Sequence, residues 1–375
     1  MIDAQAMIEQ FCELVRVDSP SLHEAQINAL VRDGLAALGI DSETDDAAES
    51  IGGDAGNIIA RVPGHEGAPT VMLNAHTDTV EPGRGICPQV DGTVISSDGS
   101  TVLGADDKAG VTIILALLEH LQQEDLPHPP LEIVFTVAEE IGLCGAKALD
   151  YSALEADMGY VLDGGRTMGV ITAAAPSSYR LGWRVRGVAA HAGVCPERGV
   201  NSIQVAAEAI AGMPLGRLDS ETTANIGVIR GGEATNIVPE LTTVDGETRS
   251  HDDAKLEKQK DRMLAAFEEA ARRHEATVQA DVELTYRSFE ISEDQPLCRY
   301  ARRAAERLGF EPQMERGGGG SDANIFNEHG IPSLILATGP AEVHTVNEWV
   351  DAELMADSAR WLAEILGMIV SDARD

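Results

Sequence analysis

A short apolar run that ends in a histidine and an aspartate is the feature that most constrains how this chain can fold. Residues 71–73 (Val-Met-Leu) are too few for an ordinary helix and follow Pro69, which predicts a strand buried on both faces, as in a parallel sheet. His76 and Asp78 come directly afterwards and are two positions apart, so they point to the same side. In open α/β sheets, ligands bind at this carboxyl-terminal edge.

The same pattern recurs in four further segments. Two adjacent aspartates follow Gly104 and precede the buried helix predicted at 111–118, and two adjacent glutamates follow the strand predicted at 131–138. Each segment alone has a plain alternative, such as a surface loop or ordinary N-capping by aspartate. Adjacent carboxylates repel each other unless a cation lies beside them, and five such segments argue against chance. The side chains that these segments deliver are His76, Asp78, Asp106, Asp107, Glu139, Glu140, Asp163 and His344.

This set of side chains predicts a metal site. Two imidazoles with several carboxylates suit zinc, cobalt or manganese, and zinc is the default. No cysteine belongs to the set, which argues against a structural zinc finger.

Length, charge and cysteine usage restrict the class of protein further. A chain of 375 residues predicts two domains, and a formal net charge of -34 argues against nucleic acid and anionic membranes as partners. The five cysteines show no C-x-x-C spacing and suggest free thiols in a reducing cytosol. The sequence shows no signal peptide and no apolar run of membrane-spanning length, so we expect a cytoplasmic protein.

Between residues 176 and 287 the pattern of apolar and polar residues differs from that of the flanking segments. Residues 179–186 and 241–248 alternate as half-exposed strands, and residues 253–273 form a charged amphipathic helix. These strands and helices do not alternate regularly, as they would around a parallel sheet, so they predict an α+β insert. We therefore expect an α/β domain with a mostly parallel sheet, formed by residues 1–175 and 288–375, with the insert between them.

Taken together, these motifs resemble the co-catalytic zinc metallopeptidase superfamily that includes peptidase T, carboxypeptidase G, aminoacylase and succinyl-diaminopimelate desuccinylase. The peptidase T-like branch is the most similar, and the segment Gly319-Gly-Ser-Asp-Ala-Asn324 contributes to that resemblance. The terminal motif Val343-His-Thr-Val-Asn-Glu348 departs from a Phe-His-Gly type, so strict tripeptide specificity does not follow. The other matching segments are His76-Thr-Asp78, Gly104-Ala-Asp-Asp-Lys108, Glu139-Glu-Ile-Gly142, Asp163-Gly-Gly and His344.

The resemblance implies a zinc-exopeptidase fold and a role for each catalytic residue. His76 and Asp163 would hold one metal ion, Glu140 and His344 the other, and Asp106 would bridge the two. Asp78 would orient His76, and Glu139 would be the general base for a metal-bridging water or hydroxide. Relatives also carry a cis peptide after the bridging aspartate, which would place one between Asp106 and Asp107.

The insert resembles the family's lid, which often forms a homodimer contact, and it carries candidates for substrate binding. His191 matches the histidine that stabilises the oxyanion, although a surface histidine in a glycine-rich turn is the alternative. Arg249 matches the arginine that binds a substrate carboxylate, and the alternative is a surface arginine on an edge strand. Asn236 is a further candidate, and Gly319 lies in a glycine run with bare backbone for a peptide. A phosphate-binding loop is the alternative interpretation of this glycine run, but no helix with a Lys-Ser/Thr signature follows it.

Three functions remain open from the sequence. The first is an exopeptidase, of aminopeptidase type, for di- and tripeptides. The second is a deacylase for N-acyl amino acids on the same fold. The third is a metal-binding scaffold without catalysis, against which Glu139 and the complete set of ligands argue.

Overall fold

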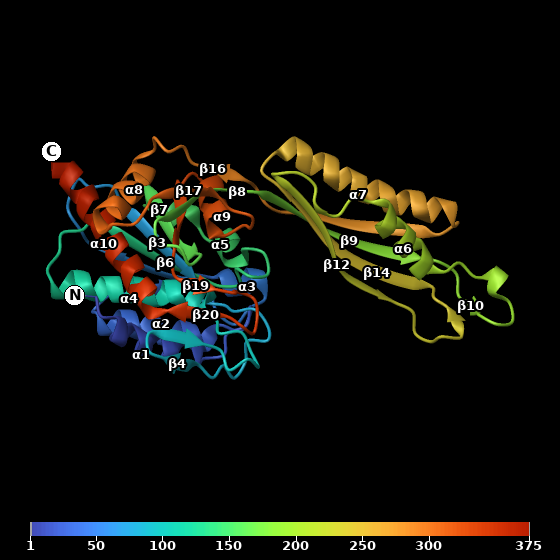
Figure 1. Cartoon of the computed structure of the whole chain (residues 1–375), viewed down its shortest axis with the longest axis horizontal. Helices are drawn as coiled ribbons and strands as arrows, with labels where there is room; N and C mark the ends of the chain where they lie inside the picture. Colours follow the sequence, from blue (N-terminus) through green and yellow to red (C-terminus); the bar gives the residue numbers. More distant parts are fainter. Residues whose placement is uncertain (1, 375) are drawn as a thin grey trace. The chain divides into compact units, whose positions relative to one another are not determined.

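The computed structural model describes residues 2–374, which divide into two compact units. The first unit consists of the residues before 175, residues 290–317 and the residues from 321 onward. The second unit consists of residues 175–289 together with 318–320. Each unit has its own hydrophobic core. Figure 1 shows the helices and strands of both units.

A nine-stranded sheet organises the first unit. Its central strands β6, β3, β7 and β18 run parallel, and β1 and β2 add an antiparallel edge. This mixed α/β fold with a mainly parallel sheet confirms the predicted fold class. The strands in order across the sheet are β1 (Ser42–Thr44), β2 (Ile58–Val62), β6 (Leu131–Thr136), β3 (Val71–His76), β7 (Met158–Gly164), β18 (Ser333–Ala337), β8 (Val170–Ala175) and β16 (Phe289–Glu290), and β17 (Gln313–Arg316) pairs with β8.

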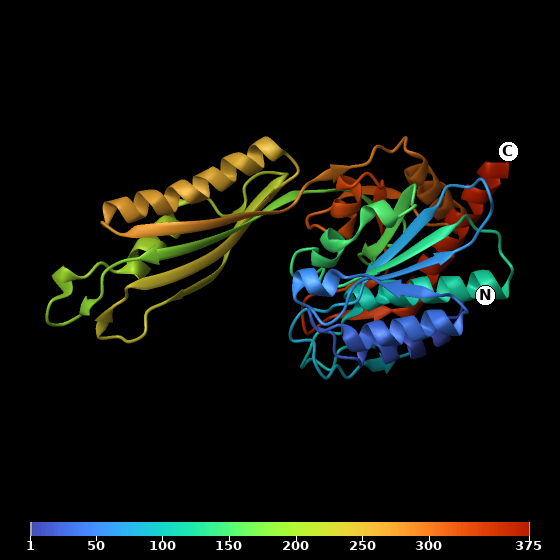
Figure 2. The same ribbon diagram turned by 180° about the vertical axis from the view of Figure 1, so that it is seen from behind.

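The central strands are apolar on both faces because helices cover them. All six residues of β3 and of β6 are buried. Figure 1 shows α4 and α10 in front of the strands, and Figure 2 shows the strands in front of α4. The helices of this unit are α1 (Ala4–Val15), α2 (Ala25–Ala37), α3 (Ala47–Ile51), α4 (Ala105–Gln123), α5 (Cys144–Ala148), α8 (Pro296–Leu308), α9 (Asp322–Glu328) and α10 (Ala352–Arg374), with a 3-10 turn at Tyr151–Ala153.

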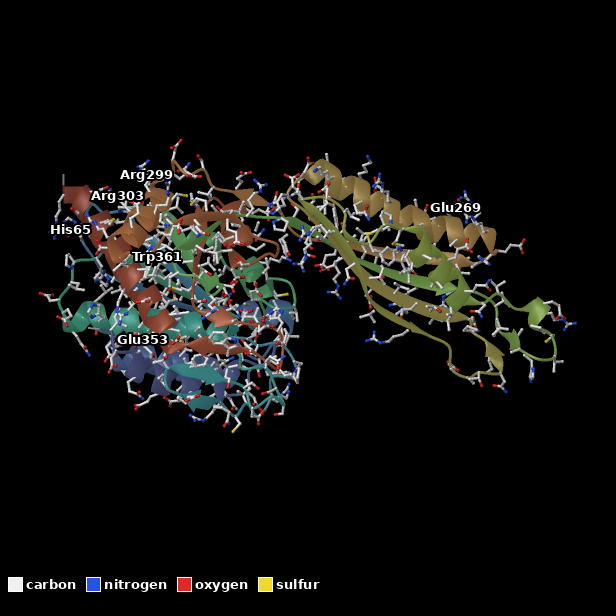
Figure 3. All side chains as sticks on the ribbon, viewed as in Figure 1. His65, Glu269, Arg299, Arg303, Glu353 and Trp361 are labelled. Carbon is white, nitrogen blue, oxygen red and sulfur yellow. The ribbon has the colours of Figure 1, made fainter. Side chains whose placement is uncertain are left out.

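The helix α10 completes the core, although the sequence analysis assigned no element to residues 352–374. It packs against α4, α8 and α1. Trp361 of α10 is fully buried, and its indole Nε1 donates to the backbone carbonyl of Ala301 in α8 at 2.8 Å (Figure 3). Within residues 2–374, no helix combines the length and the hydropathy that crossing a membrane requires.

The first unit also contains a four-stranded sheet, whose strands are close in sequence to some of the predicted metal ligands. It orders β19 (Pro340–Ala341), β20 (Trp349–Asp351), β5 (Val94–Ser96) and β4 (Gln89–Asp91). The hairpin of β4 and β5 falls in the segment 81–102, where the sequence predicts a loop with a hairpin. Strands β19 and β20 flank the segment that carries His344, so this small sheet fixes both ends of that segment.

The second unit is an antiparallel sheet covered by two helices (Figure 1). Trp183 of the sheet stacks on Phe267 with ring centroids 4.4 Å apart, at the centre of the core. The strands in order across the sheet are β11 (Gly216–Arg217), β12 (Thr222–Gly231), β14 (Leu241–Ser250), β9 (Ser177–Arg186) and β15 (Thr277–Tyr286). The two helices are α6 (Ser202–Gly212) and α7 (Asp253–Arg273). A separate pair of short strands consists of β10 (Ala190–His191) and β13 (Ile237–Val238), and a 3-10 turn lies at Pro196–Arg198.

Candidate metal centre

Three neighbouring parallel strands deliver most of the predicted metal ligands to one edge of the sheet. His76 is the last residue of β3, and Asp163 lies at the end of β7. Glu139 and Glu140 follow the end of β6 by three and four residues. Because the carboxyl ends of parallel strands meet at the same edge, side chains that are far apart in sequence come together there.

The carboxylate of Asp106 lies between two imidazoles. Its Oδ1 is 3.1 Å from Nε2 of His76, and its Oδ2 is 3.1 Å from Nε2 of His344. Oε1 of Glu140 is 3.0 Å from the same nitrogen of His344. The Asp106–Asp107 peptide is cis, as the resemblance implied.

These separations fit a shared pair of metal ions. With Zn–N and Zn–O bonds of about 2.0–2.1 Å, neighbouring ligand atoms of a tetrahedral site are about 3.3 Å apart. The donor set contains only imidazole and carboxylate, which suits zinc, cobalt and manganese. Potential ligand atoms of His76, Asp106 and Glu140 lie within 4.8 Å of one another.

A second group of potential ligands surrounds His76, and it contains a residue without a predicted role. Ligand atoms of His76, Asp107 and Asp163 also lie within 4.8 Å of one another. The carboxylate of Asp107 accepts from the backbone N–H of His76 at 3.3 Å and of Gly110 at 3.1 Å. Asp107 therefore ties the first turns of α4 to the end of β3.

The two imidazoles are held in their charged forms by the carboxylates around them. Burial opposes a charge on His76, but its contacts with Asp106 and Asp78 raise its pKa well above the usual value. Contacts with Asp106 and Glu140 raise the pKa of His344 to about 10. Burial opposes ionisation of Asp106, but the two histidines lower its pKa below the usual range.

The pKa values of three further carboxyl groups at the site, those of Glu139, Asp163 and Asp107, are raised. Burial raises the pKa of Glu139 well above its usual value, and the charges of Asp163 and Asp322 add to that effect. Burial, followed by the charge of Asp106, does the same to Asp163, and burial with the charge of Asp163 does so to Asp107. So many buried acids are compatible with ionisation only where cations bind among them.

Asp78 fixes the segment that carries the two glutamates. One of its oxygens, Oδ1, accepts from the backbone N–H of Glu139 at 3.0 Å and lies 3.2 Å from Nδ1 of His76. The other, Oδ2, accepts from the N–H of Glu140 at 3.2 Å and from the hydroxyl of Ser21 at 2.6 Å. Asp78 is fully buried, so it orients His76 and the glutamate segment together.

Sequence reasoning gave no role to several buried acids around the site. Glu24 is fully buried and accepts from the N–H of Ala138 at 2.8 Å, and burial with the charge of Asp78 raises its pKa to about 7. Asp322 accepts from the hydroxyl of Thr136, and burial raises its pKa to about 6. The segment Gly319–Asn324, quoted for its resemblance, contains Asp322, but Glu24 gave no signal because acids are common at the start of a helix.

His191 and Asn236 belong to the second unit, where the structure brings them together. The short strands β10 and β13 pair His191 with Ile237, and the backbone carbonyl of Asn236 accepts from the N–H of Ala192 at 2.9 Å. The N–H of Gly193 donates to Nδ1 of His191 at 3.1 Å. An acceptor at Nδ1 places the ring hydrogen of a neutral imidazole on Nε2, which is therefore a donor.

Arg249 and Gly319 also belong to the second unit. Arg249 lies on β14, an interior strand of the sheet, and its Nη2 donates to Oε2 of Glu247 at 2.9 Å. A Cβ on Gly319 would meet only Nη1 of Arg249, at an ordinary 3.5 Å. The position that requires glycine is Gly320, where a Cβ would lie 2.3 Å from the ring of Tyr286.

Known proteins share both the sequence pattern and the fold. Residues 72–367 match the model of peptidase family M20/M25/M40. The uncharacterized protein YqjE of Bacillus subtilis is 40% identical over 98% of this chain and 99% of its own length.

Two solved structures are similar over almost the whole chain. The aminopeptidase PepT from Bacillus cereus superposes with a TM-score of 0.86 at 41% identity, covering 98% of this chain and 99% of the other. A tripeptidase from Staphylococcus aureus superposes with a TM-score of 0.92 at 36% identity, covering both chains completely.

We predict that zinc binding releases protons. The pKa of His344 is about 10 without metal, so at pH 7.5 its imidazole is charged and must lose its proton before it can bind a cation. An unperturbed histidine would already be neutral at that pH and would release none. Zinc affinity should therefore rise as the pH rises from 6 to 8.

Isothermal titration calorimetry measures the effect directly. Titrations with zinc in buffers of different ionisation enthalpy give the number of protons from the slope of the observed enthalpy. We expect about two or more protons per chain, one from each histidine and others from buried ligand acids with a raised pKa such as Asp163. A slope of zero at pH 7.5 would show that the histidines are not held in their charged forms.

Proposed function

We propose a substrate class and a mechanism for this chain, which belongs to peptidase family M20/M25/M40. The chain is a metallopeptidase, and within that class it is a metal-dependent exopeptidase. The substrates, the role of each residue and the identity of the metal are the subject of the proposal.

One observation carries the mechanism. The two oxygens of Asp106 approach the imidazoles of His76 and His344 at equal distances of 3.1 Å. We propose that His76 and Asp163 hold one ion, that Glu140 and His344 hold the other, and that Asp106 bridges them. When bound, a pair of divalent ions polarises the scissile carbonyl and lowers the pKa of a water molecule.

Zinc is the proposed metal. The donors are imidazole nitrogens and carboxylate oxygens, and no cysteine lies among them. Cobalt or manganese would be accepted by the same donors, so the metal that the cell supplies decides between them.

Glu139 is the proposed general base. It is 8% exposed, and its backbone N–H donates to Asp78, which holds the segment that carries Glu139 at the ligand-bearing edge of the sheet. Positive charge bound next to it favours its ionised form. Glu139 would accept a proton from the attacking water and pass it to the leaving amine.

Short peptides with a free amino terminus are the proposed substrates. The similar structures from Bacillus cereus and Staphylococcus aureus are an aminopeptidase and a tripeptidase, which supports di- and tripeptides for this chain. An N-acyl amino acid also presents an amide bond for hydrolysis, so a deacylase is the alternative function. The experiment must distinguish cleavage of peptides from cleavage of N-acyl amino acids.

In the second unit, we propose that His191 stabilises the oxyanion and that Arg249 binds the substrate carboxylate. His191 has a donor at Nε2, which is the group that a developing oxyanion needs. Arg249 keeps a guanidinium held by Glu247, and its planar fork suits a carboxylate. Asn236 orders the turn that follows His191, and Gly319 leaves backbone open next to Arg249.

We also propose a cytoplasmic homodimer that forms through the second unit. None of the five cysteines, all of which lie in the described part of the chain, forms a disulfide, which suits a reducing compartment. Most of the exposed large hydrophobic side chains lie in the second unit, and such side chains favour association. They are Val188, Val194, Ile203, Leu215, Ile229, Ile237, Leu241 and Val282. Sedimentation velocity distinguishes the expected dimer from a monomer, and a monomer at micromolar concentration would overturn this part.

A substrate screen with the zinc-loaded protein tests the function. We expect hydrolysis of di- and tripeptides from a free amino terminus and poor hydrolysis of N-acetyl and N-succinyl amino acids. Glu139→Gln is the matched control, because it removes the base and not a metal ligand. It should keep both ions and lower kcat by about 10²–10⁴-fold.

Two outcomes would contradict the proposal. Faster cleavage of N-acyl amino acids than of peptides would make the chain a deacylase. A protein that holds both ions and cleaves neither class would be a scaffold without catalysis.

We predict separable effects for the two residues of the second unit. Arg249→Ala should lower kcat/KM for free tripeptides by roughly 2–4 kcal/mol, the range for truncating one partner of a buried charge pair. The same variant should matter little for peptides amidated at the carboxyl terminus. His191→Ala should instead lower kcat about 10²-fold or more for both, with little change in KM.

Kinetics on the two peptide series provides the check. Equal losses for free and amidated peptides in Arg249→Ala would rule out the carboxylate contact. A kcat close to that of the unaltered enzyme in His191→Ala would rule out the oxyanion role.

A further inference from the structure

Glu348 is a buried carboxylate that lies four residues after His344 and accepts three backbone hydrogen bonds. Its Oε2 accepts from the N–H of Leu103 at 2.7 Å and of Gly104 at 2.8 Å. Its Oε1 accepts from the N–H of Asp106 at 3.0 Å. The side chain is 1% exposed, so water does not compete for these bonds.

The three donors belong to the turn that leads into α4. The first N–H groups of a helix have no partner within the helix, and the residue that precedes α4, Gly104, has no side chain to cap them. Gly104 is in the left-handed region with φ of +74°. A carboxylate from a segment more than 240 positions later in the chain accepts from Asp106 in the first turn and from Leu103 and Gly104 just before the helix.

Glu348 is itself held in place by the four-stranded sheet. Its N–H donates to the carbonyl of Thr345 at 3.2 Å, and its carbonyl accepts from the N–H of Ser97 at 3.3 Å. The next residue, Trp349, begins β20, which pairs with β19 on one side and β5 on the other. The acceptor therefore has little freedom to follow a movement of the turn at 103–106.

The segment from His344 to Glu348 contacts Asp106 at two points. At one end, Nε2 of His344 is 3.1 Å from the side-chain Oδ2 of Asp106. At the other end, Glu348 accepts from the backbone N–H of Asp106. Two contacts from one short segment fix both where Asp106 lies and which way its carboxylate faces.

We propose that Glu348 is a positioning residue that sets the bridging carboxylate of Asp106 relative to His344, and so determines whether two cations can share it. This inference rests on the dinuclear site proposed above. Glu348 belongs to neither group of clustered ligand atoms, and both of its oxygens accept from backbone N–H groups, so we assign it no ligand role. Glu348 holds the carboxylate of Asp106 in position in the metal-free protein.

Glu348→Gln tests this role with little change in size. An amide has one acceptor oxygen, and its NH₂ group would face a backbone N–H that needs an acceptor. The turn at 103–106 would shift, and Asp106 with it. Groups that orient metal ligands typically contribute about 10–100-fold in metal affinity, and we expect zinc affinity to fall by that factor.

The chain offers a matched control in Glu132. It is also 1% exposed, and its Oε2 also accepts two backbone hydrogen bonds, from Glu155 at 3.0 Å and Ala156 at 3.2 Å. Glu132 lies near the beginning of β6, whereas the ligands follow the end of that strand. Glu132→Gln removes a similar structural bond at the other end of the sheet and should leave zinc affinity unchanged.

The measurements use the full chain without substrate. Competition with a chelator gives the zinc dissociation constants, and the visible spectrum of the cobalt-loaded protein reports the geometry of the site. We expect Glu348→Gln to bind zinc more weakly and to alter the cobalt spectrum, while Glu132→Gln does neither. Unchanged affinity and an unchanged spectrum in Glu348→Gln would overturn the proposal.

Three further outcomes have defined meanings. If Glu348→Gln does not melt cooperatively, Glu348→Asp is measured, since it keeps the charge but withdraws it by one methylene, and the same weakening is expected. If neither variant folds while Glu132→Gln does, Glu348 is needed for the fold and the positioning role is wrong. If the unaltered protein binds no zinc, the proposed dinuclear site fails instead.

Discussion

Two imidazoles from distant parts of the chain meet at one carboxylate, and much of the first unit serves to keep them there. His76 ends a central strand, His344 lies in a segment between two short strands, and Asp106 precedes a buried helix. The charge on each histidine offsets part of the repulsion among the surrounding acids. Burial raises the pKa of further carboxyl groups at the site, among them Glu139 and Asp163, so a bound cation would relieve the cost of ionising them.

Buried carboxylates also hold the loops that carry the ligands. Asp78 accepts from the backbone of Glu139 and Glu140, Glu24 accepts from Ala138, and Glu348 accepts from the turn before α4. Each acceptor lies on a segment different from the one it fixes. A carboxylate is a strong acceptor for several N–H groups at once, which explains why a site that must remain rigid contains more acids than its metals require.

The sequence predicted the fold class because its signal is periodic and local. Short apolar runs such as 71–73 and 131–138 predicted strands, and the structure confirms a mainly parallel sheet that contains both. Most of the candidate ligands could be singled out because they follow strand ends, and the role of each was implied by the resemblance to the metallopeptidase superfamily. Glu24 and Glu348 could not be given a role in this way, since their partners are backbone groups that only the folded chain brings near. The roles of His191 and Arg249 remain predictions, because neither spacing nor periodicity reports on a substrate.

The central claim is that one carboxylate is shared by two metal ions, and metal content tests it most directly. The purified chain is loaded with zinc, freed of excess metal and analysed by inductively coupled plasma mass spectrometry, beside Asp106→Asn. The account predicts two zinc ions per unaltered chain and a loss of tightly bound zinc from both sites in the variant, because an amide offers a single oxygen acceptor. A single ion in the unaltered chain, or two ions retained by Asp106→Asn, would contradict it.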